Sequence, residues 1–571
     1  MAKVADMQSA ARAVAARRQQ FDVRWSRLPL LLSAIMFLNL VAMPMKAYVT
    51  EFLPWTYVPP PAPLASTNFT FFNASTLELL QRLYNRSTLP PHVTYHEDAA
   101  GYVLRKTINP RITSLDACAS EVLPGLPGAI FYGPSFSRLI CAMAMADNGT
   151  AWNGSGDCIY LTFFTQPWIY QCLWLTSGDD LALNASAPGY TLTYAARPYP
   201  LAWWCPTKFA YRTLTTFYIA HLVWTRYYVQ CVALATSLAV TGHRPLDVKN
   251  SASIWRYEVV LGDPTAMVLT DPLVAFLLCV DIVASYDTLT FAVLRATQSA
   301  DVYVMLIAFL YLSCTVWLPY LAVSTTTLLV KRYHKERSFA QIDPTALAIA
   351  TAILGPALTW CMGNVSFFLQ FYQYLGRVAV PTSDQHTKFE SAPDVIVYLV
   401  SLASLPLMYG FGRARWQGDD VGSTRRTLLR YSSFQNNPWK NRALLALVQC
   451  LEGRSKTSGD MMERGGSVYA LFEANRQFER CPAISFRATD CFVLCHQDGM
   501  LRERLRLTLL STLDRHERDA SLAVPSTVEL SDYCVNTLHV ATRMENDMTS
   551  SAGPRLSHAV SLSSQPSAWC L

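Results

Sequence analysis

Charged residues are scarce in this 571-residue sequence, and their scarcity limits the classes of protein to which it can belong. Asp, Glu, Lys and Arg make up 15% of the chain, whereas apolar residues make up 51%. The net charge is only +6, and the Lys and Arg residues lie beside apolar runs. A nucleic-acid-binding protein gathers such residues into one basic surface. We therefore expect no nucleic-acid partner.

Motifs that carry chemistry are also missing. The segment Arg256–Pro264 lacks the glycine spacing of a phosphate loop, and the segment assigned below to the extracytosolic side has no Ser/His/Asp arrangement. Cys491, Cys495 and His496 come closest to a zinc site, but their C-x3-C-H spacing is not that of a usual zinc knuckle. We expect no cofactor, no bound metal and no catalytic residues, and an enzyme is the least favoured function.

The apolar residues are concentrated in runs of about 20 residues, the length that a helix needs to cross a ~30 Å hydrocarbon core. Six runs predict six transmembrane helices: Leu28–Met45, a segment within Thr213–Val240, Ala266–Ser285, Val302–Val330, Pro344–Tyr374 and Val395–Phe411. A basic leader, residues 1–27, precedes the first helix, residues 28–45. It lacks a clean cleavage site, which favours a signal anchor over a cleaved signal peptide.

The Lys and Arg residues set the orientation, because they are retained on the cytoplasmic side. With six spans, the three richest segments (the leader and those after spans four and six) fall on that side. Both termini are then cytosolic, and residues 46–208 form an extracytosolic domain. We expect an integral membrane protein of the secretory pathway, located at the plasma membrane.

Sequons and cysteines agree with this orientation. Six N-x-Ser/Thr sequons predict glycosylation of the extracytosolic domain at Asn68, Asn73, Asn85, Asn148, Asn153 and Asn184. In an oxidising compartment, two disulfides are expected in one of three pairings among Cys118, Cys141, Cys158 and Cys172. Cys205 is left over and is available for a bridge within a homo-oligomer. Short β-branched and aromatic runs predict an α+β or mostly β module.

Two sets of polar residues lie within the predicted spans. Asp281 has no adjacent charge, and a carboxylate in hydrocarbon is costly unless it is paired or hydrated. We expect Arg226 at a similar depth, and we predict an Asp281–Arg226 pair that serves as a structural clip or as an ion or proton site. In the fifth run, a polar helical face either lines an aqueous path or packs against other helices. Its members are Gly363, Ser366, Gln370 and Gln373.

The remaining segments follow in order. Residues 209–411 form the membrane domain with five further helices, 412–442 a polybasic segment, 443–546 a cytosolic domain and 547–571 a disordered tail. The basic residues within Arg413–Arg442 predict attraction to anionic lipid headgroups. Leucines spaced by four residues predict an amphipathic helix, so we expect a mostly helical cytosolic tail. They are Leu501, Leu505, Leu509 and Leu513.

The predicted fold class is an α-helical polytopic membrane protein with a disulfide-bonded, glycosylated α+β or β ectodomain. This layout resembles that of polycystin and mucolipin channels, which have six spans, cytosolic termini and a large glycosylated domain between the first two spans. The sequence departs from them at Gly376–Asp394, which is short, polar and lacks an obvious filter. A channel or transporter is the favoured function. The alternative is a cell-surface receptor, adhesion or scaffold protein with a ligand-binding ectodomain.

Overall fold

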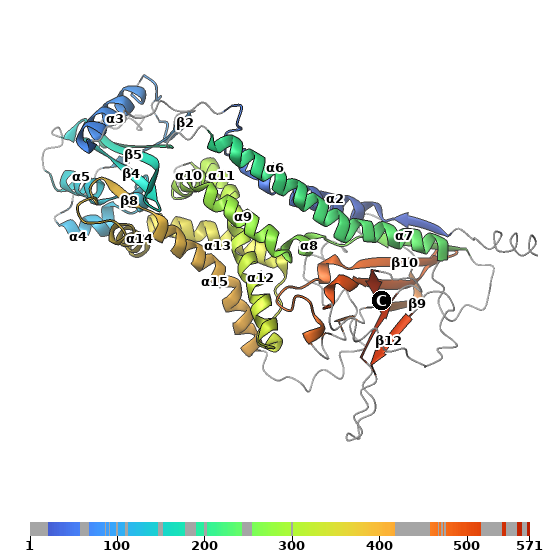
Figure 1. Cartoon of the computed structure of the whole chain (residues 1–571). Coiled ribbons are helices and arrows are strands. Elements are labelled where there is room, and N and C mark those ends of the chain that lie inside the picture. Colours follow the sequence, from blue (N-terminus) through green and yellow to red (C-terminus); the bar gives the residue numbers. More distant parts are fainter. Residues whose placement is uncertain are drawn as a thin grey trace, which may run out of the picture.

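Two β-sheet domains lie at opposite ends of a group of helices (Figure 1). The computed structural model of the chain describes residues 21–56, 203–241, 254–298 and 301–416 without interruption. In the two interrupted stretches it describes 68–85, 87–90, 92–98, 101–108, 112, 114–146, 152–177 and 190–198, and then 457–465, 468–469, 472, 476–514, 539–543, 557–561 and 568–570.

The first domain, called here the six-stranded domain, is built mainly from residues 68–198. Its sheet has the order β2 (Tyr95–Asp98), β3 (Gly101–Ile108), β6 (Tyr190–Pro198), β5 (Gln166–Ser177), β4 (Gly156–Phe163) and β8 (Lys388–Glu390). All neighbours are antiparallel except β4 and β8, which are parallel. The last strand comes from the segment just before the final helix, so this segment is part of the domain.

Helices cover both faces of this sheet (Figure 1). Helix α3 (Phe69–Leu83) packs on one face, where Phe72 and Leu80 are buried against Tyr170 and Trp174. Helix α5 (Pro134–Met145) packs on the other face. The short helices α4 (Leu115–Ala117), η2 (Cys118–Val122) and η3 (Ala129–Phe131) lie on the α5 side. The domain is thus α+β.

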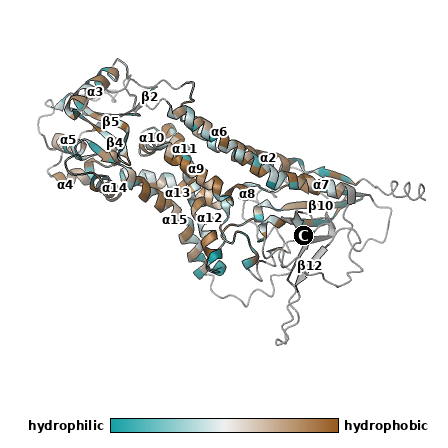
Figure 2. Ribbon diagram, viewed as in Figure 1, coloured by the Kyte–Doolittle hydropathy of each residue, from teal (hydrophilic) through white to brown (hydrophobic). Residues whose placement is uncertain are grey.

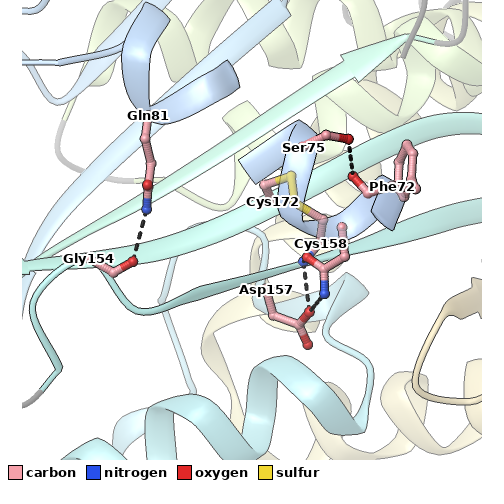
Figure 3. The surroundings of a disulfide bond; sticks show 8 residues. Phe72, Ser75, Gln81, Gly154, Asp157, Cys158 and Cys172 are labelled. Atoms are coloured by element: carbon pink, nitrogen blue, oxygen red, sulfur yellow. Dashed lines mark hydrogen bonds between the residues drawn. A yellow bond between two sulfur atoms is a disulfide. The ribbon is translucent and has the colours of Figure 1, made fainter. Parts of the chain in front are cut away.

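The four predicted cysteines form two disulfides, as expected. Cys118 bonds Cys141, which ties η2 to α5, and Cys158 bonds Cys172, which lies directly opposite it on the neighbouring strand (Figure 3). Of the three pairings that the sequence allows, the structure has the one that joins neighbours along the chain. Cys205 is a free thiol.

The second domain, called here the eight-stranded domain, joins three distant parts of the chain. Its sheet has the order β1 (Asp22–Trp25), β7 (Trp255–Val260), β10 (Cys491–Gln497), β11 (Met500–Leu509), β14 (Trp569–Cys570), β13 (Ser557–Ser561) and β12 (His539–Arg543), with β9 (Thr457–Gly465) also paired to β11. Strand β1 at the end of the leader, the segment around β7 and the described C-terminal strands therefore lie on the same side of the helices (Figure 1).

This domain corrects two expectations. The tail is not mostly helical where the structure describes it, because Leu501, Leu505 and Leu509 lie on strand β11. Residues four apart share a face in a strand as well as in a helix, and the alternating Arg502, Arg504 and Arg506 carry the strand period that we missed. Residues 547–571 were expected to be disordered, yet they contribute β13 and β14.

The helices do not support six membrane spans. Among the described residues, three are long and apolar enough to cross a membrane: Val302–Arg332, Ala346–Asn364 and Ala392–Trp416. A fourth span is added only if α9 (Pro272–Ala284) and α10 (Tyr286–Ala296), bent by 74° at Ser285, count as one. The first of the three consists of α11 (Val302–Leu312), η6 (Ser313–Val316) and α12 (Trp317–Arg332). The second lies within α13 (Pro344–Asn364), and the third is α15 (Ala392–Trp416). Apolar residues cover much of α13 and α15 (Figure 2).

The other expected spans fail for separate reasons. Helix α2 (Arg27–Val41) has only 15 residues. The second run belongs to a longer helix made of α6 (Trp204–Val223), the π-helical η5 (Trp224–Tyr228) and α7 (Val229–Thr241). This helix contains Lys208, Arg212 and Arg226 and is not among the candidate spans. The fifth run breaks at Val365, whose backbone is extended, into α13 and α14 (Ser366–Val378).

Candidate functional site

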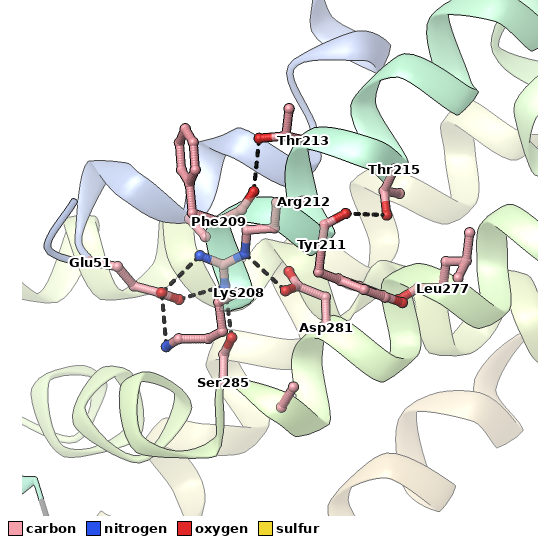
Figure 4. Close-up of polar contacts among 12 residues, drawn as sticks. Glu51, Lys208, Phe209, Tyr211, Arg212, Thr213, Thr215, Leu277, Asp281 and Ser285 are labelled. Carbon is pink, nitrogen blue, oxygen red and sulfur yellow. Dashed lines mark hydrogen bonds and ion pairs between the residues drawn. The ribbon is translucent and has the colours of Figure 1, made fainter. Parts of the chain in front are cut away.

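Five charged side chains meet where the helices join the six-stranded domain (Figure 4). We call them the charged cluster: Glu51, Lys208, Arg212, Asp281 and Asp287. Glu51 follows the short helix η1 (Pro44–Val49). Both basic residues lie one turn apart on α6, and the two aspartates lie on α9 and α10, on either side of the bend. The cluster therefore links four separate elements.

Arg212 is at the centre of the cluster and is fully buried. Its Nη1 and Nη2 atoms donate to the two carboxylate oxygens of Glu51, each at 2.8 Å. Its Nε donates to Oδ1 of Asp281 at 2.8 Å, and Nη2 also donates to the Ser285 hydroxyl at 2.7 Å. Bidentate contacts of this kind use the planar fork of the guanidinium, which lysine lacks. The side chain thereby fixes the bend between α9 and α10 to the segment after α2.

Lys208 completes the contacts of Glu51. Its Nζ lies 3.1 Å from Oε2 of Glu51 and 3.6 Å from Oδ1 of Asp287, and the Tyr311 hydroxyl donates to Oε1 of Glu51 at 3.1 Å. Burial alone would raise the pKa of Glu51, but Lys208 and Arg212 outweigh it and lower this pKa to about 2. Glu51 is therefore an anion at all physiological pH values.

A cavity of about 60 Å³ lies beside the cluster. Glu51, Lys208 and Asp287 line it together with Trp168, Trp204 and Cys205. This volume holds a few water molecules, whereas pockets for organic ligands measure roughly 300–1,000 Å³. The cluster contains three carboxylates and two basic groups, so one negative charge remains when all five are ionised. Water in the cavity would solvate that charge.

The predicted Asp281–Arg226 pair is wrong in its partner. Asp281 binds Arg212, and Arg226 lies 2.9 Å from Asp271 instead. The apolar run predicted within Thr213–Val240 leaves Arg212 outside, but the helix begins at Trp204. Arg226 lies 14 positions further on, about 21 Å along the axis at ~1.5 Å per residue. The spacing of Lys208 and Arg212 by four residues was the signal that we missed.

The predicted polar face of the fifth run binds the six-stranded domain. Ser366, Gln370 and Gln373 lie on α14 and donate hydrogen bonds to backbone carbonyl oxygens at 2.7, 3.4 and 2.8 Å. The acceptors are Ser120, Ala119 and Ala129. Gly363 lies at the end of α13, where its carbonyl oxygen accepts from Gly125. The two predicted alternatives were an aqueous path and packing against protein. These hydrogen bonds show packing for Ser366, Gln370 and Gln373.

The sequons differ in accessibility. Asn68, Asn85 and Asn153 are exposed. Asn73 is half-buried beside the Cys158–Cys172 disulfide. Its amide nitrogen donates to Asp157, and its amide oxygen accepts from the Cys158 backbone at 3.0 Å. An N-glycan is attached through that amide nitrogen. Two more sequons, Asn148 and Asn184, lie outside the described residues.

Two other predictions concern the opposite end of the helices. Only the first part of the polybasic segment is described, where Arg413 and Arg415 lie in the last turn of α15 and Arg413 contacts the ring of Tyr409.

The two cysteines that came closest to a zinc site, Cys491 and Cys495, are buried free thiols in β10. In the part of the chain that the structure describes, no three His, Cys, Asp or Glu side chains are grouped to hold a metal ion.

Comparison with known proteins gives no relative: no protein-family model, no curated protein and no solved structure is significantly similar to this chain. Its function therefore has to be argued from its own geometry.

Proposed function

We propose that this protein is a membrane-embedded receptor or scaffold that couples a glycosylated, ligand-binding six-stranded domain outside the cell to a cytosolic eight-stranded domain. One observation carries the proposal. The helix Trp204–Thr241 begins at the charged cluster beneath the first domain and ends at the second (Figure 1). At ~1.5 Å per residue it is about 57 Å long, longer than a bilayer with its headgroup regions, roughly 40–45 Å. The proposal requires this helix to cross alongside the three candidate spans, although it is less apolar than they are.

Both ends of this helix are anchored. At the first end, Lys208 and Arg212 belong to the charged cluster. At the second end, the Ala239 carbonyl accepts a hydrogen bond from Phe21 at 3.1 Å, and the Gln230 carbonyl accepts one from the Trp569 indole at 2.9 Å. A rigid element held at both ends transmits a displacement from one end to the other. This arrangement supports coupling between the domains.

The disulfides support the assignment of sides. Both disulfides of the described residues lie in the six-stranded domain. Disulfides persist in oxidising compartments outside the cytosol. Three exposed sequons on the same domain agree with this. Basic residues end α12 and α15 on the opposite side, where Lys and Arg are retained.

Transport of protons or cations is the second candidate function. It is favoured by the excess negative charge of the charged cluster next to a hydrated cavity. The polar contacts oppose it, because Arg212 holds Glu51 and Asp281 together and the polar face of α14 binds protein backbone. We therefore rank transport below coupling.

Hydrogen exchange of the full-length protein in nanodiscs tests the coupling. We compare wild type with Arg212→Gln, and use Arg82→Gln, which alters an exposed pair with Glu78, as the matched control. Arg212→Gln should speed exchange at the base of the six-stranded domain and also in β7 and β10. Faster exchange confined to the first domain would contradict coupling. Flux of protons, Na⁺ or K⁺ into liposomes, abolished by Arg212→Gln in folded protein, would establish transport instead.

A further inference from the structure

Helix α14 is held to the six-stranded domain along one face. Leu369 and Tyr372 are buried in the core that this domain shares with the helices, and Gln373 is buried with its hydrogen bond to the Ala129 carbonyl. Val365, extended before the first turn, separates α14 from α13. These contacts fix the rotation of α14 about its own axis.

The opposite face of α14 carries a stripe of large apolar side chains at spacings of four, three and four residues. Its members, called here the aromatic stripe, are Phe367, Phe371, Tyr374 and Val378, with exposed fractions of 72%, 41%, 57% and 64%. The helix contains no Asp or Glu, and Arg377 is exposed at its C-terminal end. An apolar face with aromatic residues and a basic rim is typical of helices that lie in a membrane interface.

The neighbours of α14 place this stripe at the level of a membrane surface. Helix α13 ends at Asn364, just before α14, and α15 begins at Ala392. Both are candidate spans, and both carry exposed apolar residues of their own, such as Ile353 and Val400. The aromatic stripe thus continues a surface that lipid chains would cover.

The exposed sequons lie on the other side of the sheet. Asn68 begins α3 and Asn85 follows it, while the Gly154 carbonyl next to Asn153 accepts a hydrogen bond from Gln81 of α3. Helix α3 covers one face of the sheet, and α14 joins the core on the other (Figure 1). Glycans are hydrophilic and do not enter lipid, so this arrangement leaves the α14 side free for a membrane.

We infer that α14 lies in the interface between headgroups and acyl chains, on the side of the six-stranded domain, with the aromatic stripe against phospholipid. The inference rests on the proposed function, because it requires the neighbouring helices to cross a bilayer. It adds a second attachment of the domain to the membrane, which sets the tilt of the domain and directs its glycan-bearing face toward solvent.

Depth-dependent fluorescence quenching tests this inference. An environment-sensitive fluorescent amino acid replaces one residue at a time in the full-length protein, in nanodiscs of phospholipid brominated near the headgroup or near the chain end. Phe371 and Tyr374 are the test positions. Phe71, an exposed aromatic on α3, is the control for the domain surface, and Ile353, in the middle of α13, is the control for the span.

We expect shallow bromines to quench the probe at Phe371 and Tyr374 more than deep bromines, the reverse order at Ile353, and no quenching at Phe71. Quenching at Ile353 without quenching at Phe371 and Tyr374 overturns the inference and leaves the membrane crossing intact. A doubled mass in the nanodiscs together with that result would assign the stripe to a second copy of the chain. No quenching at Ile353 overturns the membrane crossing, and the inference with it.

Discussion

The two sheet domains use cysteine in opposite ways. In the six-stranded domain, the four described cysteines form two disulfides, both between segments close in sequence. In the eight-stranded domain, the described cysteines are free thiols, and Cys491, Cys495 and Cys570 are buried among apolar side chains. One domain is cross-linked covalently, whereas the described part of the other contains no disulfide. This contrast is expected for domains on opposite sides of a membrane.

The largest expected difference between the two domains follows from the removal of a disulfide. Cys158→Ala with Cys172→Ala should destabilise the six-stranded domain by about 3 kcal/mol, because the closed loop restricts the unfolded chain. The buried Cys491→Ala in the eight-stranded domain should cost only about 1 kcal/mol, through a small cavity. Thermal unfolding in nanodiscs, with and without reductant, measures both. Equal effects of reductant on the two domains would contradict the contrast.

The next effect concerns buried ion pairs, one at the junction of the helices with the six-stranded domain and one inside the eight-stranded domain. Arg212→Met should destabilise the protein by about 3–5 kcal/mol, because Glu51 and Asp281 are left buried without their partner. Arg506→Met removes the partner of Asp490 in the eight-stranded domain and should cost less, because one carboxylate rather than two is left. Denaturant titration compares them. A smaller loss for Arg212→Met would show that the cavity hydrates the abandoned carboxylates.

The two domains should also respond to pH in opposite directions. Burial raises the pKa of Glu479, beside the eight-stranded domain, to about 7. A raised pKa means that the folded state favours the protonated acid, so its contribution to stability is complete below about pH 4.5 and is lost as pH rises through 7. Glu51, with a lowered pKa of about 2, contributes above pH 4.5 and loses its effect in acid.

Glu479→Gln should therefore raise the free energy of unfolding at pH 8 by about 3 kcal/mol, and with it the unfolding temperature, but should change neither at pH 4. The exposed Glu78→Gln is the control and should change neither value. An unfolding temperature of Glu479→Gln that follows wild type across this range would mean that Arg476, 3.5 Å from Glu479, already compensates the buried charge.

The smallest expected effect separates two sequons of the same domain. Asn85→Gln should remove one glycan and increase electrophoretic mobility, because Asn85 is exposed. Asn73→Gln should leave the mobility unchanged, since the Asn73 amide is engaged by Asp157 and the Cys158 backbone. Mass spectrometry of glycopeptides reports the occupancy of each site. A fully occupied Asn73 would mean that this part of α3 packs differently in the glycosylated protein.

The errors of the sequence reading share one origin. Arg212 lies outside the predicted apolar run because hydropathy is averaged along the chain. The free energy of burying its charge depends on Glu51 and Asp281, which come from other elements. The leucines of β11 are spaced by four residues, which places them on one face in a helix and in a strand alike, so this spacing could not separate the two. The polar face of α14 packs, as one of the two predicted alternatives has it, but its partners lie in the six-stranded domain. The helix break at Val365 depends on the hydrogen bonds that the following residues, on α14, make with the six-stranded domain. Those partners are distant in sequence.

The sequence by itself determined the properties that are local and additive. The three long apolar helices, the cysteines of the two disulfides and the basic helix ends can be found from short windows, because burial in lipid and bridging of near neighbours require no distant partner. Only the tertiary structure decided how distant segments meet. It joined β8 to the six-stranded sheet, β1 and β7 to the C-terminal strands, and Glu51 to Arg212. Such pairings depend on desolvation and geometry across the whole fold, which no window of sequence contains.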